Sequence, residues 1–527
     1  MIQAWSSRPS LSKCALRVVL LFGCLSFPAA AAAPVRIETG LVEGIPADDP
    51  SVTLYKGIPF AAPPLGDLRW RPPEPAAAWQ GVRKADQFSA ACIQDPVRSL
   101  GPWTEEYMHQ GEYSEDCLYL NVWTASQDAT VKRPVLVWIY GGAFTGGSTA
   151  VAVYDGEALA RKGLVVVTVN YRVGVLGFLA HPELTKESDA KSSGNYGVLD
   201  QIAALGWVRR NIAAFGGDPA RVTICGQSAG AASVHILTAS PLAKGLFHQA
   251  IAQSGSGLGD RLPTLPAAET EGVKFAKAKG ASSIQELRAM PVATLTARVE
   301  GAPFRSSPVM DGWLLPAQVR TVFAQGKQND VATLTGWTAD EGSYSQSYGK
   351  LTPQEFERDI RLRTGSLAIE FTKLYPVSTQ REASESQKAS ARDQNLIATF
   401  LWAKERARTA KTPVYTYYWD HAQPGPTKEV YGAFHSGELP YVFNSLKRAN
   451  RPWEALDRSI AETTSSYWAN FVATGNPSGP GLAKWPAFDG NNAVTMELGD
   501  QFTARPVAEP AKLKMFEGMF MRMAGSR

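Results

Sequence analysis

The stretch that most directly indicates the fold is VTICGQSAGAASV, residues 222–234 of a 527-residue chain. Its first four residues are β-branched or apolar and predict a buried strand, and the small residues that follow Ser228 predict a helix. Between them lies Gly226-Gln227-Ser228-Ala229-Gly230, a G-x-S-x-G pattern. Alone, this pattern also fits an ordinary glycine-rich turn. After a strand and before a helix it is typical of a nucleophile elbow, a strained turn that exposes the serine hydroxyl, so we predict that Ser228 is a nucleophile.

The segments around this stretch predict an α/β fold. Apolar residues between Val198 and Phe215 recur at helical spacing, and Gly216-Gly217 ends that helix. Two continuous apolar runs, Val135–Tyr140 and Leu164–Val169, fit strands that are buried on both faces of a parallel sheet. Strand, helix and strand therefore alternate along the chain, as in α/β proteins.

The rest of the chain contains no repeat and no Pro/Ser-rich linker, so residues 34–527 are expected to form a single domain. Tyr467–Val472 belongs to another amphipathic helix, which ends at Gly475. The stretch Ser378–Gln394 is polar, and we expect it to lie at the surface.

Residues 1–33 have the pattern of a secretory signal peptide. A basic stretch ends at Arg17, the apolar run Val18–Phe27 follows, and Ala29–Ala33 supplies small residues for cleavage. An uncleaved anchor, or a lipoprotein attached through Cys24, fits this pattern less well. We expect an exported protein, periplasmic or secreted.

The charge of the chain argues against a nucleic-acid partner. Lys and Arg number 53 and Asp and Glu 49, and loss of the three basic residues of the signal lowers the net charge from +4 to +1. No basic cluster stands elsewhere, and no later apolar run is long enough to span a bilayer, so no membrane span is expected after signal cleavage. Nothing in the sequence specifies an oligomeric state.

Three of the five cysteines remain after signal cleavage, and in an exported protein two of three should pair. Cys92 and Cys117 flank a loop rich in glycine, proline and charged residues, and closing it would stabilise the fold by roughly 3–4 kcal/mol. Cys225 lies in the predicted strand and reads as a small buried hydrophobe rather than a reactive thiol.

A serine hydroxyl needs a base, and in this type of fold the acid and then the histidine follow the serine along the chain. Of six histidines only His421 and His435 come late enough. His435 lies in the glycine-bracketed loop Gly432–Gly437, which can aim a ring, and spacing favours it. His421 follows an aromatic, strand-like run, Tyr415–Trp419, and is expected to be a turn residue.

The candidate acid lies in Asp340-Glu341-Gly342, which follows the apolar segment Val331–Gly336. Either Asp340 or Glu341 could orient the imidazole, and spacing does not choose between them. An isolated Asp-Glu-Gly is also compatible with a solvated turn.

Several blocks resemble the type-B carboxylesterase family, the α/β-hydrolases that include cholinesterases and p-nitrobenzyl esterases. The resemblance covers about residues 36–490 and is densest before residue 256. Its matching blocks are FGGDPARVTICGQSAG (215–230), EDCLYLNV (115–122), YKGIPFAAPP (55–64) and NYRVGVLGF (170–178).

The resemblance implies an α/β-hydrolase fold: a mostly parallel central sheet, helices on both faces and inserted cap elements. It also implies that the acid is Glu341, from a D-E-G motif. The histidine it implies is His435, from a G-x-x-H motif ahead of Glu438-Leu439-Pro440-Tyr441. The family's disulfide corresponds to Cys92–Cys117.

The resemblance further implies an oxyanion hole built from the backbone N–H groups of Gly142, Ala143 and Ala229, with Gly141 shaping the turn. Ser254 resembles a serine that the family places near the acid and the histidine, although it also fits an ordinary turn serine.

Three positions bear on the substrate. Tyr140 stands where many members have His, and Gln227 stands where most have Glu. Trp103 does not match the spacing of the choline-binding tryptophan of cholinesterases, and we expect it to pack at the rim. Without a carboxylate at position 227, a cationic choline ester is disfavoured, and neutral or anionic esters are expected.

These features predict a serine carboxylesterase that hydrolyses small-molecule esters through an acyl-enzyme. No metal-ligand spacing or nucleotide-binding glycine motif occurs, so no metal and no cofactor are expected. Two alternatives remain: a non-catalytic adhesion protein of the same fold, and an amidase or transacylase with the same residues. Ester classes known from the wider family include aryl esters, p-nitrobenzyl esters, phthalate diesters, carbamates and polyester toxins.

Overall fold

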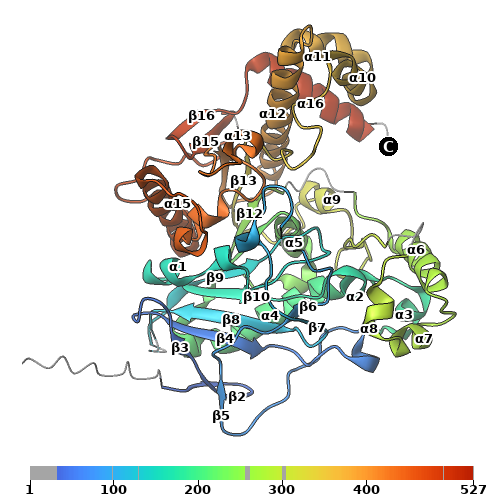
Figure 1. The fold of residues 1–527 in the computed structure, drawn as a ribbon, viewed down its shortest axis with the longest axis vertical. Coiled ribbons are helices and arrows are strands. Elements are labelled where there is room, and N and C mark those ends of the chain that lie inside the picture. Colours follow the sequence, from blue (N-terminus) through green and yellow to red (C-terminus); the bar gives the residue numbers. More distant parts are fainter. Residues whose placement is uncertain are drawn as a thin grey trace, which may run out of the picture.

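The computed structural model describes residues 33–525 apart from 98, 127, 129, 256–260, 300–303 and 491. Almost all of the predicted signal peptide therefore lies outside the described residues. The centre of the molecule is an eleven-stranded sheet (Figure 1). From one edge to the other, its strands are β16 (Phe502–Pro506), β15 (Val494–Leu498), β14 (Val414–Trp419), β13 (Ala332–Thr338), β12 (Gln249–Gln253), β11 (Gly217–Gln227), β9 (Arg133–Ile139), β10 (Val165–Val169), β8 (Tyr119–Thr124), β4 (Thr53–Pro59) and β3 (Ile45–Pro46).

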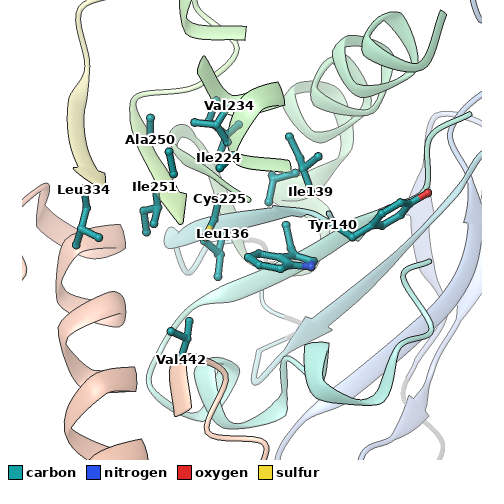
Figure 2. Packing of buried hydrophobic residues seen from close by; sticks show 14 of the residues in the cluster. Leu136, Ile139, Tyr140, Ile224, Cys225, Val234, Ala250, Ile251, Leu334 and Val442 are labelled. Carbon is teal, nitrogen blue, oxygen red and sulfur yellow. The ribbon is translucent and has the colours of Figure 1, made fainter. Parts of the chain in front are cut away.

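The sheet is mostly parallel, as predicted. All neighbouring pairs from β15 across to β10 are parallel, whereas β16, β8, β4 and β3 pair antiparallel at the two edges. Helices cover both faces. Figure 2 shows Val234 of α5 (Ala229–Ala239) and Val442 of α14 (Leu439–Val442) on opposite sides of the central strands. The expected α/β-hydrolase architecture is confirmed.

The two apolar runs form the centre of this sheet. All residues of β10 are buried, and so are those of β9 from Pro134 onward. Because helices cover both faces, neither face of these strands needs polar side chains. The predicted helix between them and β11 is α4 (Tyr196–Asn211), which continues as a 3-10 turn and ends at Gly216 with φ +76°. The predicted C-terminal helix is α15 (Ala455–Thr474), which ends at Gly475.

Two groups of inserted helices extend from the sheet at different ends (Figure 1). The first group packs around its own hydrophobic cluster, and the second group meets the C-terminal helix α16 (Pro510–Gly525). The first comprises α6 (Leu265–Ala278), α7 (Ile284–Ala289) and α8 (Val292–Thr296), and the second comprises α10 (Pro353–Thr364), α11 (Ala368–Leu374) and α12 (Gln380–Arg406).

The polar stretch Ser378–Gln394 differs from its prediction. It forms the first half of α12, and Ser386 and Ser390 on one face of that helix are buried. The surface prediction is therefore wrong for this face. Small hydroxyl side chains are compatible with burial because their hydroxyls donate to backbone carbonyls of Pro376 and Gln387. Within the described residues, no helix combines the length and the apolar character that a bilayer crossing requires.

Candidate active site

Ser228 stands at a sharp turn between β11 and α5. Its φ of +58° is unusual for a residue with a side chain and stores strain of roughly 1–3 kcal/mol. The Ser228 N–H donates to the carbonyl of Gln253 on the next strand (2.9 Å). A Cβ on Gly226 would lie 2.4 Å from the carbonyl oxygen of Gly230, and one on Gly230 would lie 2.0 Å from that of Ile139. Only glycine fits at either position, so helix and strand can approach closely enough to form the elbow.

Glu341 and His435 come from two loops at the same edge of the sheet. Glu341 follows β13, and His435 precedes α14. The His435 Nδ1–H donates to Glu341 Oε2. The other carboxylate oxygen accepts the Ser254 hydroxyl and the Thr338 N–H (2.8 Å). The carboxylate is thus held on both oxygens, which fixes the ring and leaves Nε2 without its proton.

The neighbouring carboxylate, Asp340, makes contacts away from the imidazole of His435. Its carboxylate pairs with the Arg392 guanidinium (2.6 Å) and accepts the Tyr348 hydroxyl (3.0 Å) and the Ala433 N–H (3.1 Å). Of the two adjacent carboxylates, it is therefore Glu341 that faces the imidazole.

Glu341 and His435 also shift each other's pKa. Burial alone would lower the pKa of His435, but the charge and the hydrogen bond of Glu341 outweigh burial and raise that pKa above its ordinary value. Burial conversely would raise the pKa of Glu341, and the adjacent imidazolium together with the donors around the carboxylate holds it below its usual range. The structure thus favours an ionised carboxylate beside an imidazole that binds a proton readily.

The loop after β9 carries the predicted oxyanion donors. Gly142 has φ +115° and Ala143 has φ +54°. The N–H groups of Gly142, Ala143 and Ala229 donate to no acceptor in the part of the chain that the structure describes. Ala229 is the first residue of α5, where backbone N–H groups lack helical partners. All three are free to bind an anionic oxygen.

A single cavity of about 1610 Å³ joins these groups. Ser228, Glu341, His435 and the loop residues Gly141–Ala143 all line it. Ligand sites for drug-sized molecules usually measure about 300–1,000 Å³, so this cavity is large.

Comparison with known proteins agrees with this architecture. The sequence profile of the carboxylesterase family matches residues 31–516. The chain belongs to the carboxylesterase family. It is 36% identical to fumonisin B1 esterase of Sphingopyxis macrogoltabida, with 94% of this chain and 93% of that protein covered. Identity is 34% to cocaine esterase of Homo sapiens (87% and 86% covered) and 33% to a medium-chain fatty acyl-CoA hydrolase precursor of Anas platyrhynchos (83% of each). This carboxylesterase is a carboxylic ester hydrolase, and its substrates are small-molecule esters.

Gln227, the residue before Ser228, faces His435 in this carboxylesterase. Its side chain is buried and lines the cavity, and its Nε2 lies 3.1 Å from His435 Nε2. Since Nδ1 carries the ring proton, the amide donates to the Nε2 lone pair. No hydrogen bond joins Ser228 Oγ to this ring among the described residues, and the Gln227 amide contacts the ring nitrogen that would accept a proton from the serine. Catalytic hydrogen bonds often align only once substrate is bound.

Gln94 is a site residue that sequence reasoning missed. Its Oε1 accepts the Gly147 N–H (2.7 Å), and its Nε2 donates to the carbonyls of Gly147 (2.8 Å) and Cys92 (2.9 Å). Cys92 is joined to Cys117 by a disulfide. The disulfide loop therefore braces the glycine-rich loop that carries Gly142 and Ala143.

Two further contacts support the histidine loop. The Trp103 indole N–H donates to the carbonyl of His435 (2.9 Å), and the two rings meet edge to face. Behind the loop, Glu438 is fully buried and accepts the Gln253 side-chain amide (2.9 Å). Burial, followed by the nearby charge of Glu341, raises the pKa of Glu438 to about 7. Trp103 is thus more than rim packing, because its indole N–H binds the backbone of the His435 loop.

The remaining sequence predictions concern Cys225, Tyr140 and His421. Cys225 is a free, fully buried thiol in β11. Tyr140 stacks on Tyr171 and donates to its carbonyl (3.1 Å). His421 does follow β14, but it is buried, with Nε2 2.9 Å from Asp457 and Nδ1 2.6 Å from Asp500. Its ring is therefore a structural link rather than an exposed turn side chain.

Proposed function

We propose that this carboxylesterase hydrolyses uncharged esters through an acyl-enzyme formed on Ser228. The observation that carries the proposal is the hydrogen-bonded pair of Glu341 and His435, which lines the same cavity as a serine on a strained elbow. This is the arrangement in which a serine hydroxyl becomes an effective nucleophile.

The proposed reaction has two halves. Ser228 Oγ attacks the ester carbonyl carbon while His435 Nε2 takes its proton, and the negative oxygen is stabilised by the N–H groups of Gly142, Ala143 and Ala229. His435 then protonates the leaving alcohol. Water, activated by the same ring, releases the acid and restores the serine. Glu341 orients the ring and stabilises its cation throughout.

A covalent label tests the nucleophile directly. A fluorophosphonate should add one phosphonyl group, with loss of fluoride, to the peptide that contains Ser228, and should abolish hydrolysis of p-nitrophenyl acetate. Absence of both turnover and labelling would favour the adhesion alternative. Comparison of an ester and an amide with the same acyl group distinguishes an esterase, which should prefer the ester, from an amidase.

We further propose that residues 1–33 are removed on export to the periplasm or the medium, and that residues 34–527 form a single catalytic domain. The disulfide between Cys92 and Cys117 supports export, because disulfides persist in oxidising compartments. Mass spectrometry of the non-reduced mature protein should find this bridge, a free Cys225 and no peptide from residues 1–33. A bridge to Cys225, or retention of the leader, would contradict this proposal.

A further inference from the structure

The cavity has two chemically different walls. One wall belongs to the inserted helices α6 and α8 together with α2 (Gly174–Phe178), which Figure 1 shows side by side. The Phe304 ring packs edge to face on Phe275, with 5.3 Å between ring centroids. The apolar side chains of this wall also form the molecule's second hydrophobic cluster, so the wall is backed by packed core. Its lining side chains are Val175, Leu176, Phe275, Leu295 and Phe304.

The opposite wall comes from α10 and α12 and is polar. Gln387, Gln394 and Asn395 present their amides along α12. Gln387 Oε1 is buried without a partner among the described residues, while Gln387 Nε2 donates to the Ser347 carbonyl (3.2 Å). The side chains of Gln394 and Asn395 are half-buried. Buried polar groups are normally hydrogen-bonded, so the Gln387 side-chain oxygen at the cavity wall indicates a ligand that donates a hydrogen bond to it.

The charges on the cavity lining are neutralised within the protein. Three arginines line it, and each pairs with an aspartate: Arg298 with Asp95 (2.8 Å), Arg363 with Asp359 (2.7 Å) and Arg392 with Asp340 (2.6 Å). No lysine occurs among the described lining residues. The polar wall is therefore suited to uncharged hydrogen-bonding groups rather than to an ionic head group.

Two apolar side chains of the cavity lining meet solvent, next to the exposed pair of Arg298 and Asp95. Leu100 and Tyr344 line the cavity and yet keep 59% and 55% of their surface exposed. Exposed apolar side chains at the rim of a large cavity are typical of sites that take apolar chains from water.

From these two walls we propose that the substrate is an amphiphilic ester, with a long alkyl chain on one side of the ester bond and an uncharged, hydroxyl-bearing group on the other. The chain lies along the Leu295 and Phe304 wall. The hydroxyls bind along α12, where one donates to Gln387 Oε1 and others reach the half-buried amides of Gln394 and Asn395. The inference rests on the proposed function, because the ester bond must reach Ser228 between the walls.

Four uncharged esters test it, each below its critical micelle concentration. Glycerol monodecanoate carries the chain on the acyl side and hydroxyls on the alcohol side, and decyl glycolate reverses them. Methyl decanoate has only the chain, and glycerol monoacetate has only the hydroxyls. At least one amphiphile should exceed both single-feature esters in kcat/KM by about tenfold or more. The better amphiphile identifies which half of the ester meets which wall.

Two variants assign the walls. Phe304→Ala should lower kcat/KM for the better amphiphile about tenfold more than for glycerol monoacetate. Phe488→Ala is the matched control, since Phe488 is also half-buried and packs edge to face on Phe400 (5.6 Å), but lies outside the cavity. Asn395→Leu should lower kcat/KM for the amphiphile about fivefold relative to methyl decanoate, and Asn395→Gln should recover most of that loss.

Equal kcat/KM for all four esters, or for methyl decanoate and both amphiphiles, would overturn the inference. If Phe304→Ala did not fold, the four-ester comparison with the wild type would still decide. Ser228→Ala separates this failure from failure of the proposed function. Turnover that is lost in Ser228→Ala but shows no amphiphile preference leaves the nucleophile in place and refutes only the substrate class.

Discussion

The Ser228 elbow and the His435 loop bring the proposed nucleophile and the proposed base to one cavity, but the two segments are held in different ways. The elbow is held by neighbours: the close approaches of Gly226 and Gly230 are to atoms of the same turn and of adjacent β9. The His435 loop is held by residues that are distant in the sequence. Trp103 binds its carbonyl across 332 positions in the sequence, and Glu341 binds its ring across 94.

From this difference we expect the elbow to control whether turnover occurs, and the residues around the histidine loop to control the geometry and pKa of His435. A strand–turn–helix with two obligatory glycines presents its serine whatever lies opposite, so substitutions there should remove chemistry outright. The histidine loop obtains its orientation and its proton affinity from distant groups. Substitutions in those distant groups should shift the orientation and the pKa of His435 gradually. A graded series of variants can test this contrast with the elbow.

The largest effect is expected from Ser228→Ala, which should lower kcat by about a millionfold, with His435→Ala nearly as severe, because these groups act as a unit. Turnover of p-nitrophenyl acetate measures both. Ser233→Ala is the control: Ser233 lies on the same helix, but its hydroxyl accepts the Gln201 amide. It should retain turnover within a few-fold. Ser228→Ala activity within about tenfold of wild type would exclude Ser228 as the nucleophile.

Glu341→Gln should lower kcat by about ten-thousandfold, since an amide no longer holds the reactive tautomer. The ester-hydrolysing form needs neutral His435, and Glu341 raises the pKa of His435. The acid limb of kcat/KM against pH should therefore lie above pH 6.5 in the wild type and move to lower pH in Glu341→Gln.

Asp340→Asn is the matched control for that variant, because Asp340 pairs with Arg392 and not with the ring. It should lower thermal stability and leave the acid limb in place. A shift of the limb in Asp340→Asn but not in Glu341→Gln would reverse the assignment of the two carboxylates.

Gln94→Ala should lower kcat by about tenfold with little change in KM, because it loosens the loop that carries the oxyanion donors rather than removing a donor. Steady-state kinetics with a short ester separates the two constants. Gln94→Glu, which keeps the acceptor for the Gly147 N–H, should lie between Ala and wild type. A change confined to KM would mean that Gln94 contacts substrate and does not position the loop.

Gln227→Glu should act mainly on pH dependence. A carboxylate 3–4 Å from the ring, in place of the amide, would favour the imidazolium and raise the pKa of His435 further, which moves the acid limb upward. It should also improve relative activity on a quaternary-ammonium ester over a matched neutral ester. The measurement is kcat/KM across pH for both esters. An unchanged profile together with an unchanged preference would refute this role.

The smallest effect on turnover is expected from His421→Ala, the other late histidine. His421 lies between Asp457 and Asp500, so its loss should lower the free energy of unfolding by about 3 kcal/mol and leave kcat per folded molecule largely intact. Chemical denaturation and active-site titration measure the two quantities separately. A large fall in kcat of the folded fraction would place His421 in the chemistry.

Local sequence patterns were sufficient to predict several elements of the fold. The apolar runs 135–140 and 164–169 are strands because continuous burial leaves no polar periodicity. The segment 222–234 is a strand and a helix because of its β-branched and small residues, and its glycines permit the close turn between them. The same patterns singled out Ser228 and a buried Cys225.

Local patterns could not assign the groups that act across long separations. Spacing left Asp340 and Glu341 equivalent, and the choice depends on which carboxylate reaches a loop 94 residues away. The polar stretch before residue 394 resembled a solvated surface, because hydrophilic side chains facing a cavity and facing bulk water have the same composition. The contacts of Gln94 could not be predicted from the sequence either, because a hydrogen bond to a glycine 53 residues later imposes no periodicity on the chain.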